Sequence, residues 1–117
     1  MKMERVDAGP LEDREIARWM AGRAEEIAGF LKALSHEGRL MILCHLSGGE
    51  RSVTELEALL GARQAAVSQQ LARLRAEGLV SARRDGKVIH YSIRDPKAAA
   101  IMALVYDLFC GPESARP

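Results

Sequence analysis

The sequence has few aromatic residues, two cysteines and no long hydrophobic run. Aromatic residues make up only 4% of the 117 residues, so we expect a core built mainly from Leu, Ile, Val, Met and Ala. No apolar run approaches the roughly 20 residues of a membrane-spanning helix, which argues against a membrane protein. The N-terminus also lacks the continuous apolar core of a secretory signal peptide. We therefore expect a cytoplasmic protein.

Motifs of catalytic chemistry are also missing from the sequence. It contains no Gly-rich phosphate loop and no motif of paired carboxylates. Cys44 beside His45 superficially suggests a nucleophile and its base, but neighbouring residues on a helix project about 100° apart and cannot pair. We expect neither an enzyme nor a bound cofactor.

The charge of the chain is nearly balanced overall but unevenly distributed. The net charge is +1, which by itself says nothing about nucleic acid. Residues 63–94 contain seven Lys and Arg against two acidic residues, a net +5, whereas residues 1–62 carry a net −3. A charged run is more often an ordinary solvated face. This one coincides with the motif described next, where contacts to phosphates would be needed.

The stretch 51–80 is the best defined part of the sequence and predicts two helices joined by a tight turn. Ser52 and Glu55 have the spacing of a capping box, which begins a helix. Gly61 can adopt the left-handed conformation that ends it within one residue. The second helix has an apolar face at helical spacing and ends near Gly78. The apolar positions of the two helices are Leu56, Leu59 and Leu60, then Val67, Leu71 and Leu74.

The opposite face of this second helix is small or amide-bearing and carries no charge, being formed by Gln64, Ala65, Ser68, Gln69 and Ala72. Such a face is unusual on a solvated helix, where Lys and Glu are common. It suits a helix that lies in the major groove of DNA, close to base edges. An ordinary helical hairpin with one polar face is an equally good interpretation of this motif alone.

A predicted β-hairpin follows directly. Residues 79–84 and 87–93 flank Asp85-Gly86, a strong signal for a two-residue turn. The tip reads Arg-Arg-Asp-Gly-Lys and is cationic. A helix-turn-helix followed by such a hairpin is a winged helix. A winged helix that only binds proteins is the alternative, and the cationic wing argues against it.

The run from Phe30 to Ile93 resembles the ArsR/SmtB family of bacterial repressors, with the segments 30–36, 66–71 and 91–93 carrying the likeness. The resemblance covers roughly residues 24–110. It implies a mainly α fold with a small β-hairpin wing, a homodimer, and binding to an operator that is an inverted repeat in double-stranded DNA. The residues that we expect to contact DNA are Arg63, Gln64, Ser68, Gln69, Arg73, Arg84 and Lys87. Arg63 stands where relatives usually have Ser as the helix cap.

Helices flank the winged helix on both sides, and we expect one domain over residues 11–110 between flexible segments 1–10 and 111–117. A first helix runs from Leu11, and Ser35 can cap the next, residues 37–46, which is apolar almost all round and should be buried. Asp95 and Pro96 open a last helix that reaches Phe109. The outer helices carry apolar stripes, which are either core or, as the resemblance favours, a dimer interface of Ile16, Trp19, Met20, Ile101, Leu104 and Leu108.

Metal sensing lacks a credible set of ligands. Residues 37–62 contain one cysteine, and the last helix has no histidine, so neither a Cys pair nor an acid/His constellation is present. Two cysteines in a cytoplasmic chain are also an improbable structural disulfide, because that compartment keeps thiols reduced. We expect no bound metal.

Cys44 and Cys110, by their positions, resemble the two thiols of the persulfide-responsive and sulfide-responsive subgroup of this family. The resemblance implies that sulfane sulfur bridges the two thiols with a short polysulfur chain, and that DNA is then released. A plain disulfide needs Cα atoms about 4.4–6.8 Å apart, whereas a longer sulfur chain spans a wider gap. Low-molecular-weight persulfides and polysulfides are thus the expected inducers. The alternatives are peroxide sensing through a disulfide, a metal ion, or a Cys44 that is simply part of the core.

Overall fold

The structure, a computed structural model, describes residues 10–111 and their side chains from Asp13 on. It divides into two compact units, residues 1–32 and 33–117, and each is described by itself. The segments 1–10 and 111–117, predicted to be flexible, lie almost wholly outside the described residues. No helix in the described part of the chain is long and apolar enough to cross a membrane.

The first unit consists of most of helix α1, Pro10–Leu34. Its predicted apolar stripe is largely open in the single chain, since Trp19 is 71% exposed, Met20 is 49% exposed and Ile16 is half-buried. Arg23 and Glu26 form an exposed salt bridge of 3.0 Å on the same helix.

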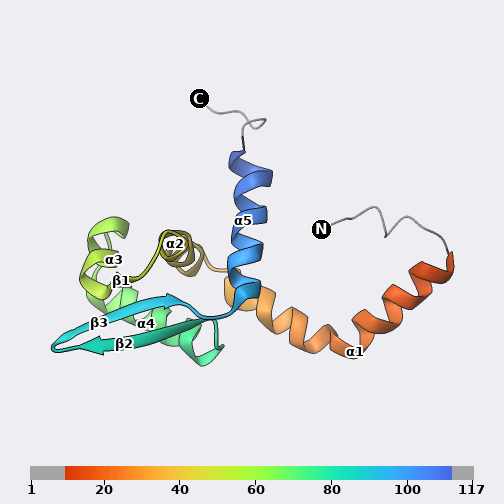
Figure 1. Ribbon diagram of the computed structural model, residues 1–117, viewed down its shortest axis with the longest axis horizontal. Coiled ribbons are helices and arrows are strands. Elements are labelled where there is room, and N and C mark those ends of the chain that lie inside the picture. Colours follow the sequence, from red (N-terminus) through yellow and green to blue (C-terminus); the bar gives the residue numbers. More distant parts are fainter. Residues whose placement is uncertain (1–9, 112–117) are drawn as a thin grey trace. The chain divides into compact units, whose positions relative to one another are not determined.

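The second unit is a winged helix (Figure 1), as the sequence predicts. Helices α2 (Glu37–Leu46), α3 (Val53–Leu60) and α4 (Gln64–Ala76) precede a hairpin of β2 (Val80–Asp85) and β3 (Val88–Ile93), and α5 (Pro96–Cys110) follows it. The core is aliphatic, as predicted from the scarcity of aromatic residues. Its largest buried side chains are Ile42, Leu43, Leu56, Val67, Leu71, Leu74, Leu79 and Val80.

The predicted helix-turn-helix is confirmed in its local chemistry. The amide of Glu55 donates to Oγ of Ser52 at 3.1 Å, and the amide of Ser52 donates to Oε1 of Glu55 at 2.8 Å, which completes the capping box. Gly61 ends α3 with φ 61°, in the left-handed region that favours glycine.

The wing differs from the prediction in two details. The turn lies one residue later than expected: Asp85 pairs with Val88, so Gly86 and Lys87 form the loop, and Gly86 supplies the positive φ of 66°. The hairpin is also part of a three-stranded antiparallel sheet of order β1-β3-β2. The added strand β1, Arg51–Ser52, was missed because it has only two residues and overlaps the cap of α3.

The helix starts around the winged helix are specified by side chains. The prediction that Ser35 caps α2 is wrong, because His36 is the cap and its Nδ1 accepts from the amide of Gly38 at 3.0 Å. Asp95 caps α5 as predicted by accepting from the amide of Lys97 at 2.9 Å. This backbone hydrogen bond lowers the pKa of the Asp95 carboxyl.

Candidate DNA interface and thiol cleft

Helix α4 has one buried side and one open side. Val67, Leu71 and Leu74 anchor the helix in the core. The open side presents the residues predicted to read DNA, because Gln64, Ser68 and Gln69 are all exposed on it. The open side of α4 thus presents short polar side chains that can approach base edges.

Arginines flank the open side of α4 at both of its ends. Arg63 occupies the N-cap position, where relatives usually have Ser, and makes no side-chain capping bond. Arg73 lies near the other end, where its Nε is 3.2 Å from Oε2 of Glu77. Both side chains are exposed and therefore accessible to a phosphate.

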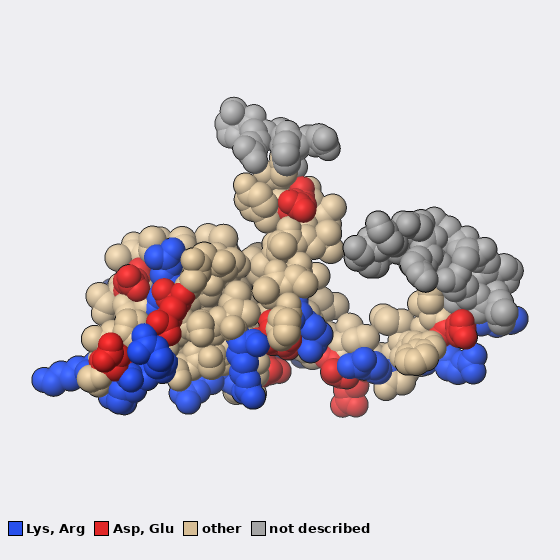
Figure 2. Space-filling view, viewed as in Figure 1, with Lys and Arg blue, Asp and Glu red and all other residues tan. Residues whose placement is uncertain are grey.

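The wing, formed by β2 and β3, carries a group of cations at its tip. Arg84 and Lys87 are exposed there, and Nη1 of Arg84 lies 3.5 Å from the carbonyl oxygen of Gly86. Figure 2 shows the Lys and Arg side chains gathered over this part of the molecule. Arg83 instead forms a two-pronged salt bridge with Glu50, at 3.0 and 2.7 Å. The hydrogen bond from Arg83 lowers the pKa of Glu50.

Helix α2 is buried on one side only, which corrects the expectation that this almost entirely apolar helix is buried. Ile42, Leu43 and Leu46 point into the core, whereas Met41 and Cys44 are exposed. Since Met41 and Cys44 are three residues apart, they share one side of the helix. The alternative that Cys44 is simply a buried residue of the core is therefore wrong.

The open side of α2 faces a cleft of about 840 Å³, which we call the thiol cleft. Its walls come from α2, the segment after it, the end of β3 and the length of α5. Both cysteines line it, together with apolar residues that include Met41, Met102 and Val105. Neither cysteine is in a disulfide, and both side chains are exposed.

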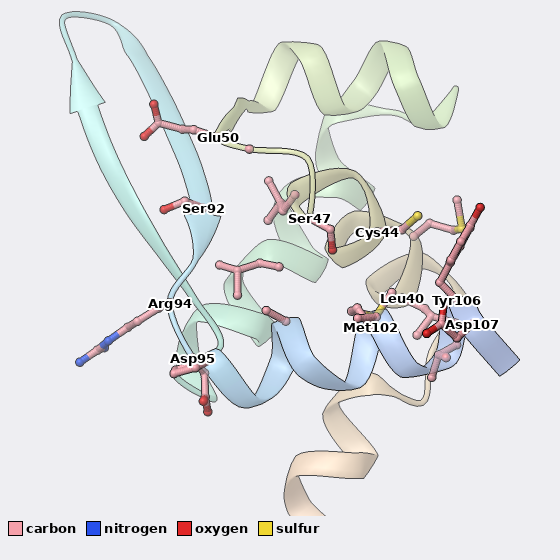
Figure 3. Close-up of a pocket in the computed structure, with 18 of the residues that line it drawn as sticks. Leu40, Cys44, Ser47, Glu50, Ser92, Arg94, Asp95, Met102, Tyr106 and Asp107 are labelled. Atoms are coloured by element: carbon pink, nitrogen blue, oxygen red, sulfur yellow. The ribbon is translucent and has the colours of Figure 1, made fainter. Parts of the chain in front are cut away.

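The two ends of the thiol cleft differ in character (Figure 3). Arg94 and Asp95 lie at one end, where β3 passes into α5. Cys44 and Tyr106 lie at the other end, reached from α2 and α5. Cys110 follows Tyr106 by about one helical turn on the same side of α5, so it belongs to the end of the cleft that holds Cys44.

Helix α5 has its buried residues, its predicted dimer stripe and Cys110 on different sides. Ala98 and Met102 are buried. The predicted dimer stripe remains open in the single chain, with Ile101 half-buried, Leu104 50% exposed and Leu108 64% exposed. Cys110 lies about two and a half turns after Ile101 and hence on the opposite side of the helix. The thiol of Cys110 and the predicted dimer stripe therefore lie on different sides of α5.

Histidines and acidic residues do not assemble a metal site within residues 10–111, where no group of three His, Cys, Asp or Glu side chains could hold an ion. His36 is engaged in capping α2. The carbonyl of His45 accepts from Nε of Arg51 at 3.4 Å.

One contact that sequence reasoning missed joins α2 to α4. Nη1 of Arg39 donates to Oε1 of Gln70 at 2.9 Å, and its Nε donates to the carbonyl oxygen of Ala33. The signal in the sequence was a single arginine within an apolar helix, which must find partners if it is buried.

A winged helix with an aliphatic core, a helix whose exposed side is polar, and a cationic wing defines a DNA-binding regulator. Comparison with known proteins agrees, since the family described as "Bacterial regulatory protein, arsR family" matches residues 36–82. The biofilm growth-associated repressor of Agrobacterium fabrum is 49% identical over 94 residues, which cover 80% of each chain.

Solved structures show the same likeness. The transcriptional repressor BigR from Xylella fastidiosa is 46% identical, with a TM-score of 0.77 over 80% of this chain and 96% of that chain. Reduced HlyU from Vibrio cholerae is 36% identical, with a TM-score of 0.76 over 80% of this chain and 98% of that chain. The chain belongs to the ArsR family of bacterial regulatory proteins. It is a DNA-binding transcriptional repressor similar to BigR and not an enzyme, and members of this family are typically dimers.

Proposed function

We propose that this repressor senses persulfides and polysulfides through Cys44 and Cys110, and that it releases its operator when a polysulfur chain joins the two thiols. The observation that carries the proposal is that both cysteines are exposed in the same apolar cleft. An apolar cleft suits a neutral sulfur chain and disfavours a charged one. The genes then expressed are those that remove sulfide.

In the bridging reaction, the persulfide is both the sulfur donor and the oxidant. Each cysteine thiolate attacks the outer sulfur of one persulfide molecule, the sulfur–sulfur bond breaks, and a low-molecular-weight thiol leaves. Two protein persulfides result. The terminal sulfur of one attacks the inner sulfur of the other and expels hydrogen sulfide. The dithiol and two persulfide molecules thus yield one trisulfide, two thiols and one hydrogen sulfide.

A bridge between these cysteines would couple two parts of the molecule that have different tasks. Cys44 lies on α2, which packs against α3 and α4, and Cys110 lies on α5, which carries the dimer stripe. Joining them would change how the two α4 helices are spaced across a dimer. Half-sites lie about 34–36 Å apart, so a dimer held off this spacing cannot seat both helices.

Operator contacts are divided by chemistry in this proposal. Gln64, Ser68 and Gln69 approach base edges and nearby phosphates, and Arg63 and Arg73 approach phosphates. Arg84 and Lys87 reach the flanking groove from the wing. The operator is an inverted repeat because the protein that reads it is a two-fold dimer.

The test uses DNA release by purified protein on a duplex selected by the wild type from a random-sequence library, here called the selected operator. Glutathione persulfide should lower the affinity of the wild type more than about a hundredfold, a coupling of about 3 kcal/mol. Cys44→Ser and Cys110→Ser should each bind when untreated and stay bound after treatment. Full release from either single variant would mean that one reactive thiol does the sensing and that no bridge is involved.

The dimer has its own test through the stripe on α5. Leu108→Glu puts a charge on the exposed apolar side and should convert a homodimer into monomers, because burying an unpaired carboxylate costs more than the contact contributes. Light scattering coupled to size exclusion measures the change, and Leu108→Met is the matched control that keeps the apolar contact. A wild type that is monomeric at micromolar concentration and still binds the selected operator would contradict the proposal.

A further inference from the structure

The guanidinium of Arg39 is the one strongly buried cationic group within the described residues, and it joins two helices. Arg39 is only 8% exposed. Its Nε donates to the carbonyl oxygen of Ala33 at 2.6 Å, before α2 begins, and its Nη1 donates to Oε1 of Gln70 on α4 at 2.9 Å. The planar fork of an arginine holds both partners in one fixed geometry, which a flexible ammonium would not.

The surroundings of this contact are closely packed. A Cβ built on Gly38 would lie 3.7 Å from Cγ of Gln70 and 3.1 Å from Cε1 of His36. The amide of Arg39 lies 3.4 Å from Nδ1 of His36, the atom that caps α2. The first turn of α2 is thus fixed at its start by the cap and across to α4 by Arg39.

Gln70 connects the buried contact with Arg39 to the part of α4 that carries the exposed side chains. It is half-buried, and it follows Ser68 and Gln69, which are exposed on the open side of the same helix. Any rotation of α4 about its axis that breaks the contact with Arg39 also turns these two side chains. A buried hydrogen bond to a charged group resists such a rotation because Nη1 of Arg39 would lose the acceptor that Gln70 provides.

We propose that Arg39 is a positioning residue for DNA recognition, which sets the rotation of α4 through Gln70 so that the open side meets the base edges in register. The inference rests on the proposed function only in that α4 is the helix that reads DNA. It does not involve the thiols, and it assigns a role in sequence discrimination to two residues that are not among the proposed DNA contacts.

The test is a double-mutant cycle on untreated protein with Arg39→Met, Gln70→Met and the double variant. Affinity is measured for the selected operator and for an unrelated duplex of the same length. Each single change should lower the ratio of specific to non-specific affinity about tenfold, and the double variant should lose little more than either single variant. The salt dependence should stay as in the wild type, since no phosphate contact is removed.

A conservative variant separates positioning from mere stability. Gln70→Glu keeps an acceptor for the guanidinium, so the specificity ratio should stay within about twofold of the wild type. Urea unfolding of every variant identifies any that are not folded, and if Arg39→Met fails to fold, the two Gln70 variants carry the test. Losses that simply add, or a Gln70→Glu that loses as much specificity as Gln70→Met, would overturn the inference.

The variant Gln69→Ala distinguishes a failure of the proposed DNA contacts from a failure of the positioning role of Arg39. If that change leaves the specificity ratio unaltered, then α4 is not the reading helix and the proposed DNA contacts are wrong. If Gln69→Ala relaxes specificity while the cycle on Arg39 and Gln70 is additive, then the proposed contacts stand and only the positioning role fails.

Discussion

Helices α2 and α4 are built alike on their buried sides and differently on their open sides. Each anchors itself in the core with aliphatic residues, and a buried arginine links the two. The open side of α4 presents short amides and hydroxyls to solvent, whereas the open side of α2 presents Met41 and Cys44 to an apolar cleft. Under the proposed function, this difference places DNA reading on α4 and thiol sensing on α2.

The largest expected effects are on DNA binding by variants of the wing and of α4. Arg84→Ala and Lys87→Ala should each weaken binding to all DNA sequences alike and reduce the salt slope by up to about one unit, because a phosphate contact is lost. Gln69→Ala should instead relax discrimination among operators, by about 1–3 kcal/mol. Fluorescence anisotropy at several salt concentrations measures both quantities.

Arg23→Ala is the control for these variants, since Arg23 lies on α1 in a salt bridge with Glu26 and outside the winged helix. It should change neither the salt slope nor the sequence preference. Wing variants that alter sequence preference while leaving the salt slope untouched would show that the roles of wing and helix are wrongly assigned.

A smaller effect, on stability, is expected from changing the N-cap residues of α2 and α4. His36→Ala should destabilise the protein by about 1 kcal/mol because α2 loses its cap, and His36→Asn should restore the stability. Arg63→Ser should do the reverse at α4: it adds the missing cap and stabilises the fold by up to about 1 kcal/mol, yet it weakens DNA binding. Urea unfolding and operator affinity measure the two quantities. If the Arg63→Ser variant binds the operator as tightly as the wild type, then Arg63 does not contribute to DNA binding.

Local chemistry explains why much of the fold could be predicted from the sequence. The bounds of α2, the capping box at Ser52 and the turn at Gly61 depend on residues within a few positions of one another. Errors arose where two local solutions compete. His36 replaced Ser35 as a cap because the Nδ1 of an imidazole can accept as a hydroxyl does, and the hairpin loop moved by one residue to place Gly86 at the positive φ.

Contacts between distant segments could not be predicted in the same way. Arg39 and Gln70 are 31 positions apart, and nothing near either residue announces its partner. The thiol cleft likewise needs α5 beside α2. The pairing of Cys44 with Cys110 was inferred from a family resemblance and not from any local pattern, so its role stays a prediction.

The most direct test of thiol sensing is mass spectrometry of digested protein after treatment with glutathione persulfide and, separately, with hydrogen peroxide. After persulfide, the peptides that contain Cys44 and Cys110 should be joined, with the mass of at least one sulfur beyond a plain disulfide. Peroxide should not produce this species. A bare loss of two hydrogens in both treatments, or added sulfur confined to one cysteine, would contradict a polysulfur bridge as the switch.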